Sequence, residues 1–192
     1  MASTEESTVL IWNNNMVGRG HQVMGHSSLN INGVWNHGGD ITPNYVSWWP
    51  GDTGSNMAKP QESFSRDGLL EKYLPDHIIR LKSLDVPVML SKWRDVRTKE
   101  NAHYRERVKN CSTIVGRILR AGSEKATCAL WYGHSVIWTP LKVKRLAFKL
   151  GGVEVDWKDF EQQLRKERAE ISCRWMMKRD RKHGNPNTPA RF

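Results

Sequence analysis

The sequence predicts an α+β fold in which a small antiparallel sheet packs against helices. Strand-like segments come first, because residues 8–16, 23–31 and 44–50 are short apolar runs separated by stretches rich in Gly and Asn. From about residue 85 the apolar residues recur at helical spacing instead. Strands followed by helices, rather than alternating with them, are typical of α+β chains. With 192 residues, 38% of them hydrophobic, the chain is long enough for one sizeable core.

The strand region has a simple order. "TVLIWNNNM" (8–16) and "VMGHSSLNI" (23–31) are predicted as the first two strands, joined by the turn-forming "VGRGH". "NYVSWWP" (44–50) is predicted as the third. Residues 50–68 show no apolar periodicity, which predicts a long surface loop of the kind that often borders a binding site.

The first two predicted helices follow from periodicity. Met89, Trp93 and Val96 lie on one face of a helix that begins near residue 85. A second helix is predicted to begin at or beside Cys111, where "NCSTIVGRIL" places its apolar residues on one stripe, and to end at Gly122.

The C-terminal third is predicted to hold two more helices. Thr139 can cap the first of them, with Pro140 in its first turn and a glycine at 151 or 152 after its end. A charged helix is then expected from about Trp157 to Lys182. This pattern divides the chain into a compact domain over residues 1–155 and a basic helix with a flexible tail over residues 156–192.

The charge is concentrated near the C-terminus. The chain carries 30 Lys and Arg against 20 Asp and Glu, a formal net charge of +10. Residues 141–192 contribute 14 bases and 7 acids, so +7 of that charge lies there. A basic segment allows binding to nucleic acid or to an anionic membrane surface. The acids interspersed in "DFEQQLRKERAEI" are typical of a solvated helix face and argue against nucleic acid.

The N-terminus predicts a protein that is made in the bacterial cytoplasm without a signal peptide. "MASTEESTVL" has no basic region followed by a long apolar run, and no stretch of the chain approaches the roughly 20 apolar residues of a membrane span. Three irregularly spaced cysteines predict neither a disulfide framework nor a zinc site. No cofactor is expected.

Cys111 and His26 are the candidate catalytic pair. A helix N-terminus favours the thiolate, and Asn110 before the cysteine is a good cap, so the sulfur would lie at the positive end of the helix. His26, among small residues that leave space around it, is the candidate base. The alternative is that both are packing residues, in a basic module that binds nucleic acid or docks on a membrane or a partner without catalysis. His134, in the aromatic segment "WYGHSVIWTP", is the reserve base.

The order of these motifs resembles a known superfamily. "GHSSL", "YVSWWP", "NCSTIV" and "WTP" followed by a helix resemble the circularly permuted papain-like cysteine enzymes, which include NlpC-like and lecithin:retinol acyltransferase-like proteins. The set is most similar to the effector domains typified by the Rho-inactivation domain of MARTX toxins and by IcsB. The resemblance covers roughly residues 20 to 150. It implies a papain-like permuted fold and a secreted or injected toxin or effector that acts on an ester, thioester or amide carbonyl.

The resemblance also implies roles for particular residues. Cys111 matches the nucleophile, His26 the base, and an acid between them completes a Cys-His-Asp set. Asp85, where "LKSLDVPVM" passes into a helix, is the predicted acid, although an Asp at that place is very often only a helix cap. Asp40 and Asp76 are the other candidates.

Two adjacent tryptophans are candidate substrate contacts. On a strand, Trp48 and Trp49 point to opposite faces, so at most one of them can join the core. The other can line a substrate groove, or the loop after residue 50 can cover both.

The expected partners follow from this assignment. They are a protein or peptide substrate, an acyl-thioester donor, an anionic membrane surface at the basic C-terminal helix, and an immunity protein. Hydrolysis of a protein or amide and acylation of a lysine use the same thiol chemistry. The sequence therefore leaves the choice among protease, amidase and acyltransferase open.

Overall fold

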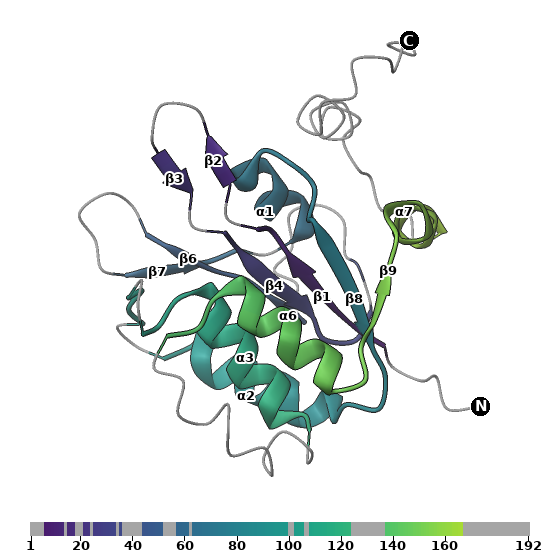
Figure 1. The fold of residues 1–192 in the computed structure, drawn as a ribbon. Helices are drawn as coiled ribbons and strands as arrows, with labels where there is room; N and C mark the ends of the chain where they lie inside the picture. Colours follow the sequence, from purple (N-terminus) through teal and green to yellow (C-terminus); the bar gives the residue numbers. More distant parts are fainter. Residues whose placement is uncertain are drawn as a thin grey trace.

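A five-stranded antiparallel sheet forms the centre of the molecule (Figure 1). The structure is a computed structural model, and it describes residues 6–13, 15–17, 21–23, 25–33, 35, 44–51, 57–61, 63–99, 102–105, 108–123 and 137–166. The strands, in their order across the sheet, are β5 (Tyr45–Val46), β4 (Ser27–Asn30), β1 (Ser7–Ile11), β8 (His77–Leu81) and β9 (Val153–Val155). The α+β class predicted from the sequence is confirmed.

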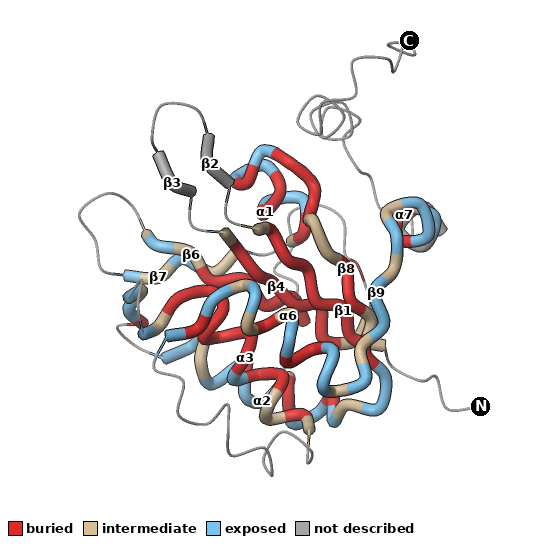
Figure 2. Tube along the Cα trace, viewed as in Figure 1, coloured by how far each residue is buried: buried red, intermediate tan, exposed pale blue. Residues whose placement is uncertain are grey.

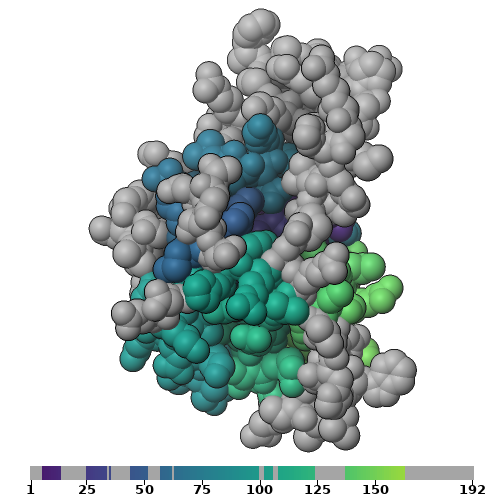
Figure 3. All heavy atoms as spheres, turned by 90° about the vertical axis from the view of Figure 1, so that its left-hand side faces the viewer, coloured from purple at the N-terminus to yellow at the C-terminus, as the bar shows by residue number. Residues whose placement is uncertain are grey.

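Helices cover both faces of this sheet. One face carries the layer formed by α2 (Val86–Arg97), α3 (Cys111–Ala121) and α6 (Pro140–Lys149). On the other face, apolar side chains from α1 (Phe64–Glu71) and α7 (Trp157–Lys166) share a cluster with the strands. Figure 3 shows the blue atoms of the segment that contains α1 bordering the teal atoms of the segment that contains α2 and α3.

The alternation of β1 explains why both faces are covered. Val9 and Ile11 point into the core under α2, α3 and α6, whereas Leu10 and Trp12 belong to the second cluster with α1 and α7. β1 is buried throughout (Figure 2), and because both of its faces are covered, the sequence from Val9 to Trp12 is a continuous apolar run rather than an alternating one.

Two of the predicted strands are interrupted. Residues 8–16 divide between β1 and β2 (Asn15–Val17), and residues 23–31 divide between β3 (His21–Val23) and β4. Strands β2 and β3 form a separate hairpin beyond the central sheet (Figure 1). The third segment is divided too, into β5 and β6 (Trp48–Pro50), and β6 pairs with β7 (Ala58–Pro60).

The prediction of a surface loop over residues 50–68 is wrong. This stretch contains β7 and the start of α1, which Ser63 caps by accepting a hydrogen bond from the backbone amide of Arg66. The buried positions of α1 are Phe64, Asp67, Gly68 and Glu71. They have helical spacing, but only Phe64 is a large apolar residue, so the helix has almost no hydrophobic periodicity to detect.

The other predicted helices agree closely with the structure. Helix α3 begins at Cys111 and is followed by Gly122, and α6 has Thr139 as its cap and begins with Pro140. The predicted C-terminal helix is present over α7, and its expected continuation to residue 182 lies outside the described residues. At the start of α7, Phe160 is fully buried in the second cluster. Within the described ranges, no helix is both long and apolar enough to cross a membrane.

Candidate active site

The first turn of α3 holds a buried cysteine. Asn110 caps the helix, because its side-chain oxygen accepts hydrogen bonds from the backbone amide (2.8 Å) and the hydroxyl (3.0 Å) of Thr113. Its side-chain amide donates to the backbone carbonyl of Trp138 at 2.9 Å, which ties the cap to the segment that leads into α6. Cys111 follows as the first helical residue and is only 6% exposed. The thiol therefore lies at the positive end of a firmly capped helix.

His26 lies where β4 packs against this helix end. Its backbone exchanges two hydrogen bonds with Trp12, of 2.8 and 3.0 Å, which continue the pairing of β1 with β4. The next residue, Ser27, donates a hydrogen bond from its hydroxyl to that of Ser112 at 3.0 Å. This contact joins residues 85 positions apart in the sequence. The structure thus brings the neighbourhood of His26 to that of Cys111, as predicted.

The carboxylate that contacts His26 belongs to Asp67 of α1. The His26 ring donates from Nε2 to Asp67 Oδ2 at 3.2 Å, and Tyr45 donates its hydroxyl to the same oxygen at 2.7 Å. The other oxygen, Oδ1, accepts from the Ser47 hydroxyl at 2.6 Å and from Trp49 Nε1 at 2.8 Å. Asp67 is fully buried, so these four donors replace the water that a carboxylate otherwise requires.

Two tryptophans hold the His26 ring. Trp49 stacks on it, with ring centroids 4.5 Å apart and planes 29° from parallel. Trp12 lies 5.5 Å from it, tilted by 49°. With Nε2 engaged by Asp67 and two indoles close to the ring, the orientation of the imidazole is determined by its surroundings.

The pKa values of the pair are shifted toward the charged forms. Burial alone lowers the pKa of His26, but the Asp67 carboxylate and Cys111 raise it by their charge and by hydrogen bonds, and the result lies well above 6.5. Burial alone raises the pKa of the Cys111 thiol. The charge of His26, a hydrogen bond with its ring and smaller contributions from the Ser27 backbone and the Ser112 hydroxyl outweigh burial, so the thiol pKa falls below 9.0. Both shifts favour a thiolate beside an imidazolium.

The structure places the predicted acid, Asp85, elsewhere. Asp85 is exposed and caps α2, its carboxylate accepting a hydrogen bond from the backbone amide of Val88 at 3.0 Å. Asp76 accepts from the backbone amide of Asn13 at 2.8 Å. The third candidate, Asp40, and the reserve base His134 lie outside the described residues. Among the predicted groups that the structure describes, only His26 and Cys111 are brought together.

The two candidate substrate contacts have different surroundings. Trp48 is only 1% exposed and packs edge to face against Trp93, with ring centroids 6.2 Å apart, so it is a core residue and is not placed to contact substrate. Trp49 is partly buried and contacts the His26 ring and Asp67. The prediction that at most one of the pair joins the core is confirmed.

Sequence reasoning missed Asp67, Tyr45 and Ser47. Asp67 lies in the stretch predicted as a loop, and a single acidic residue there has no distinguishing pattern. The one usable signal is "ESFSRDG", in which Ser63 precedes Phe64 and an acid follows in the first turn of α1, as is common at helix starts.

The described residues contain no group of three or more His, Cys, Asp or Glu side chains placed to hold a metal ion. The polar groups of the site instead satisfy one another. In space, the contacts run from the Cys111 thiol to the His26 imidazole and on to the Asp67 carboxylate. This order allows proton transfer from sulfur to nitrogen.

Comparisons with known proteins identify the family of the chain. The family model described as IcsB middle domain matches residues 1–82 and 74–170, which together cover most of the chain. A multifunctional-autoprocessing repeats-in-toxin protein of Vibrio cholerae serotype O1 and one of Vibrio vulnificus are each 33% identical to it over 66 residues. Those residues are 34% of this chain and 1% of each toxin, so the chain corresponds to a small part of the toxins.

No solved structure matches the chain significantly. The family match and the similarity to toxin segments confirm the predicted relationship to this group of bacterial proteins. The chain belongs to the IcsB middle domain family.

Proposed function

We propose that this chain is the catalytic domain of a bacterial effector or toxin and that it acts as a cysteine enzyme. The observation that carries the proposal is the chain of contacts from Cys111 through His26 to the buried carboxylate of Asp67. A structural cysteine in an apolar core has a raised pKa and no imidazole beside it, whereas this thiol has a lowered pKa because of His26. The family match and the similarity to toxin segments support the assignment.

In the proposed mechanism, His26 takes the proton of the Cys111 thiol. Since Nε2 donates to Asp67, Nδ1 is the ring nitrogen left to accept that proton. Asp67 then stabilises the imidazolium and keeps the ring oriented, while its other hydrogen bonds keep the carboxylate itself in place. Asp67 takes the role that the sequence suggested for Asp85.

The thiolate then attacks a carbonyl carbon. A carbon–sulfur bond forms, the carbonyl π electrons move to oxygen, and the amides at the N-terminus of α3 stabilise the resulting oxyanion. The oxyanion collapses, the bond to the leaving group breaks, and the imidazolium of His26 returns the proton to that group. Attack by water or by an amine on the thioester releases the acyl group and restores the thiol.

His26 precedes Cys111 in the sequence, which supports the proposal of a permuted papain-like enzyme because that order is the one expected for such a fold. Because a lysine side chain or water can serve as the acyl acceptor, the same site suits lysine acylation, peptide cleavage and amide hydrolysis. We favour a protein substrate, with a long-chain acyl thioester as the donor where the reaction is acylation.

Intact-mass measurement with a thioester donor tests the proposal. The purified chain is incubated with the palmitoyl thioester of N-acetylcysteamine, and a lysine-containing peptide is added in a second step. The expected result is a palmitoyl adduct on Cys111 that is absent in Cys111→Ala and that passes to the peptide or to water.

The outcomes of this experiment separate the alternatives. Transfer to the peptide indicates an acyltransferase, and release of palmitate indicates a hydrolase. An adduct that persists in Cys111→Ala contradicts the role of this thiol. If the palmitoyl donor gives no adduct, labelling of Cys111 by a peptide carrying an electrophilic carbonyl decides for a protease, and failure of both reagents overturns the proposal.

A further inference from the structure

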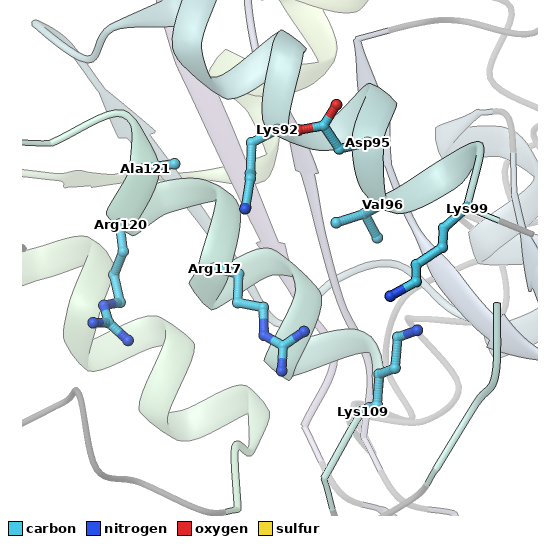
Figure 4. A pocket seen from close by; sticks show the side chains of 8 residues that line it. All are labelled: Lys92, Asp95, Val96, Lys99, Lys109, Arg117, Arg120 and Ala121. Atoms are coloured by element: carbon cyan, nitrogen blue, oxygen red, sulfur yellow. The ribbon is translucent and has the colours of Figure 1, made fainter.

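A pocket of about 560 Å³ lies between α2 and α3, outside the cluster formed by Cys111, His26 and Asp67 (Figure 4). Its volume is within the range of about 300–1,000 Å³ that is usual for sites binding small molecules. The charged residues that line it are Lys92, Asp95, Lys99, Lys109, Arg117 and Arg120. Five of the six are cationic.

Two helix faces converge to produce this charge. On α2, residues 92, 95 and 96 share one face, and Lys99 follows just past the helix end. On α3, Arg117 and Arg120 are three positions apart, and Lys109 lies two residues before the helix begins. Figure 4 shows the side chains of Lys99 and Lys109 pointing toward one another, with Arg117 beside them.

The cations are not neutralised by neighbouring side chains. In the part of the chain that the structure describes, none of the five forms an ion pair, and a single carboxylate, that of Asp95, lines the pocket with them. Over the same ranges, Nε of Arg120 is buried and has no hydrogen-bond partner. An unpaired buried donor costs free energy unless a ligand or solvent accepts from it.

The crowding of like charges is visible at Lys109. Partial burial lowers its pKa, and the positive charges of Lys99, Arg117 and Arg105 lower it further. Its ammonium group lies 5.4 Å from the centroid of the Trp48 ring. These positive charges gather around one pocket, and an anion that shares the space would relieve the repulsion between them.

The chemistry of the lining indicates the ligand class. Guanidinium groups bind phosphate oxygens through paired N–H donors, and lysines add point charges around them. Five cations against one carboxylate exceed what a single carboxylate or phosphate would neutralise. We propose that the pocket between α2 and α3 binds a small ligand that carries two or more phosphate groups, either as a free molecule or as the headgroup of a lipid.

Isothermal titration calorimetry tests this site with three probes. Pyrophosphate and inositol trisphosphate represent free ligands, and phosphatidylcholine vesicles with and without phosphatidylinositol bisphosphate represent the lipid source. The pocket variant combines Lys92→Gln with Arg117→Gln, one change on each helix, and both side chains are exposed so that the fold is retained. The control variant combines Arg145→Gln with Lys158→Gln, which removes the same two charges from exposed positions outside the pocket.

We expect saturable binding of at least one probe. Loss of two charge-assisted contacts should weaken it about tenfold or more in the pocket variant, and the control should change it by less than about twofold. Binding of pyrophosphate or inositol trisphosphate without pocket-dependent binding of the phosphatidylinositol bisphosphate vesicles identifies a free ligand, and pocket-dependent binding of those vesicles identifies a lipid headgroup. Equal weakening in both variants, or no saturable binding of any probe to the native chain, overturns the proposal.

Discussion

Asp67 is the residue on which the proposed site depends most. A fully buried carboxylate is tolerated only when donors replace its water, and Asp67 has four of them from Tyr45, Ser47, Trp49 and His26. Tyr45 lies in β5, Trp49 lies in β6, and Ser47 lies between these two strands. The carboxylate therefore links α1, the strands and the imidazole, and its position determines that of the base.

Replacing Asp67 with Asn should impair catalysis strongly. The amide retains the size of the side chain but brings N–H donors toward groups that are themselves donors, and it removes the negative charge that supports the imidazolium. We expect the acylation rate to fall by about 100-fold or more, and the free energy of unfolding to fall by about 1–3 kcal/mol.

The matched control is Asp85→Asn. Asn is as good a helix cap as Asp, so this variant should retain both its rate and its stability. Rates for the two variants are compared by acyl-enzyme formation, and stabilities by urea denaturation. A rate loss in Asp85→Asn that equals the loss in Asp67→Asn would contradict the assignment of the acid.

Trp49→Phe separates stacking from hydrogen bonding. Phe can still stack on His26, but it cannot donate to Asp67 as the indole does at 2.8 Å. Because one of four donors is lost while the ring contact remains, we expect a decrease of about tenfold in the rate of acylation. Circular dichroism should show an unchanged fold. A variant that acylates at the native rate would show that this hydrogen bond has no role in the activity.

At the scale of elements, the contrast between α1 and α3 explains what the sequence can predict. Helix α3 has an Asn cap, an apolar stripe and a glycine after its end, so its bounds and the place of Cys111 were predicted correctly. Helix α1 buries Asp67, Gly68 and Glu71, so the pattern that normally reveals a helix is absent. Asp67 was missed because the helix that carries it buries mainly polar and small residues, so its sequence does not look like that of a packed helix.

The strands show a similar limit. His26 was predicted to lie within one continuous strand, but β3 ends at Val23 and β4 begins at Ser27. The two backbone hydrogen bonds between His26 and Trp12 still hold it beside the sheet. The pattern of apolar residues predicts which segments are extended. It does not predict where an extended segment leaves the central sheet to form a separate hairpin.

Helix α3 is held in place by a close contact at Gly116. A methyl group there would lie 2.7 Å from the Trp138 ring, nearer than side-chain carbons normally approach. Although Ala is ordinarily the better helix former, we expect Gly116→Ala to lower the free energy of unfolding by about 1–3 kcal/mol. The neighbouring change Arg117→Ala, at an exposed position, should alter it by less than about 0.5 kcal/mol. Urea denaturation measures both, and equal stabilities would contradict the close packing of α3 on Trp138.

At the scale of the whole molecule, the sheet separates two clusters and the site lies at their border. The Cys111 helix packs on one face, and the Asp67 helix packs on the other. His26 reaches both because it lies at the end of β4, beside Trp12, which belongs to the second cluster. The proposed catalytic arrangement therefore depends on the complete fold, because Cys111, His26 and Asp67 come from three distant parts of the chain.

The central claim is that His26 activates Cys111 and that Asp67 supports it. The pH dependence of Cys111 alkylation by iodoacetamide tests this claim most directly, in a chain whose other cysteines, Cys128 and Cys173, are replaced with Ser. The Cys111 thiolate of the native site should form below pH 9.0, because the pKa of the thiol is lowered by His26. Without the imidazole, burial dominates and raises that pKa.

The predicted midpoint of the alkylation curve of His26→Ala lies about one pH unit or more above that of the native chain. The midpoint of Asp67→Asn should lie between those of the native chain and His26→Ala. The His26 pKa is raised, so the imidazolium that favours the thiolate persists above pH 6.5 and is lost as the pH passes that raised pKa. A midpoint that is the same in the native chain and in His26→Ala would show that the two residues are not coupled, and would contradict the account of this site.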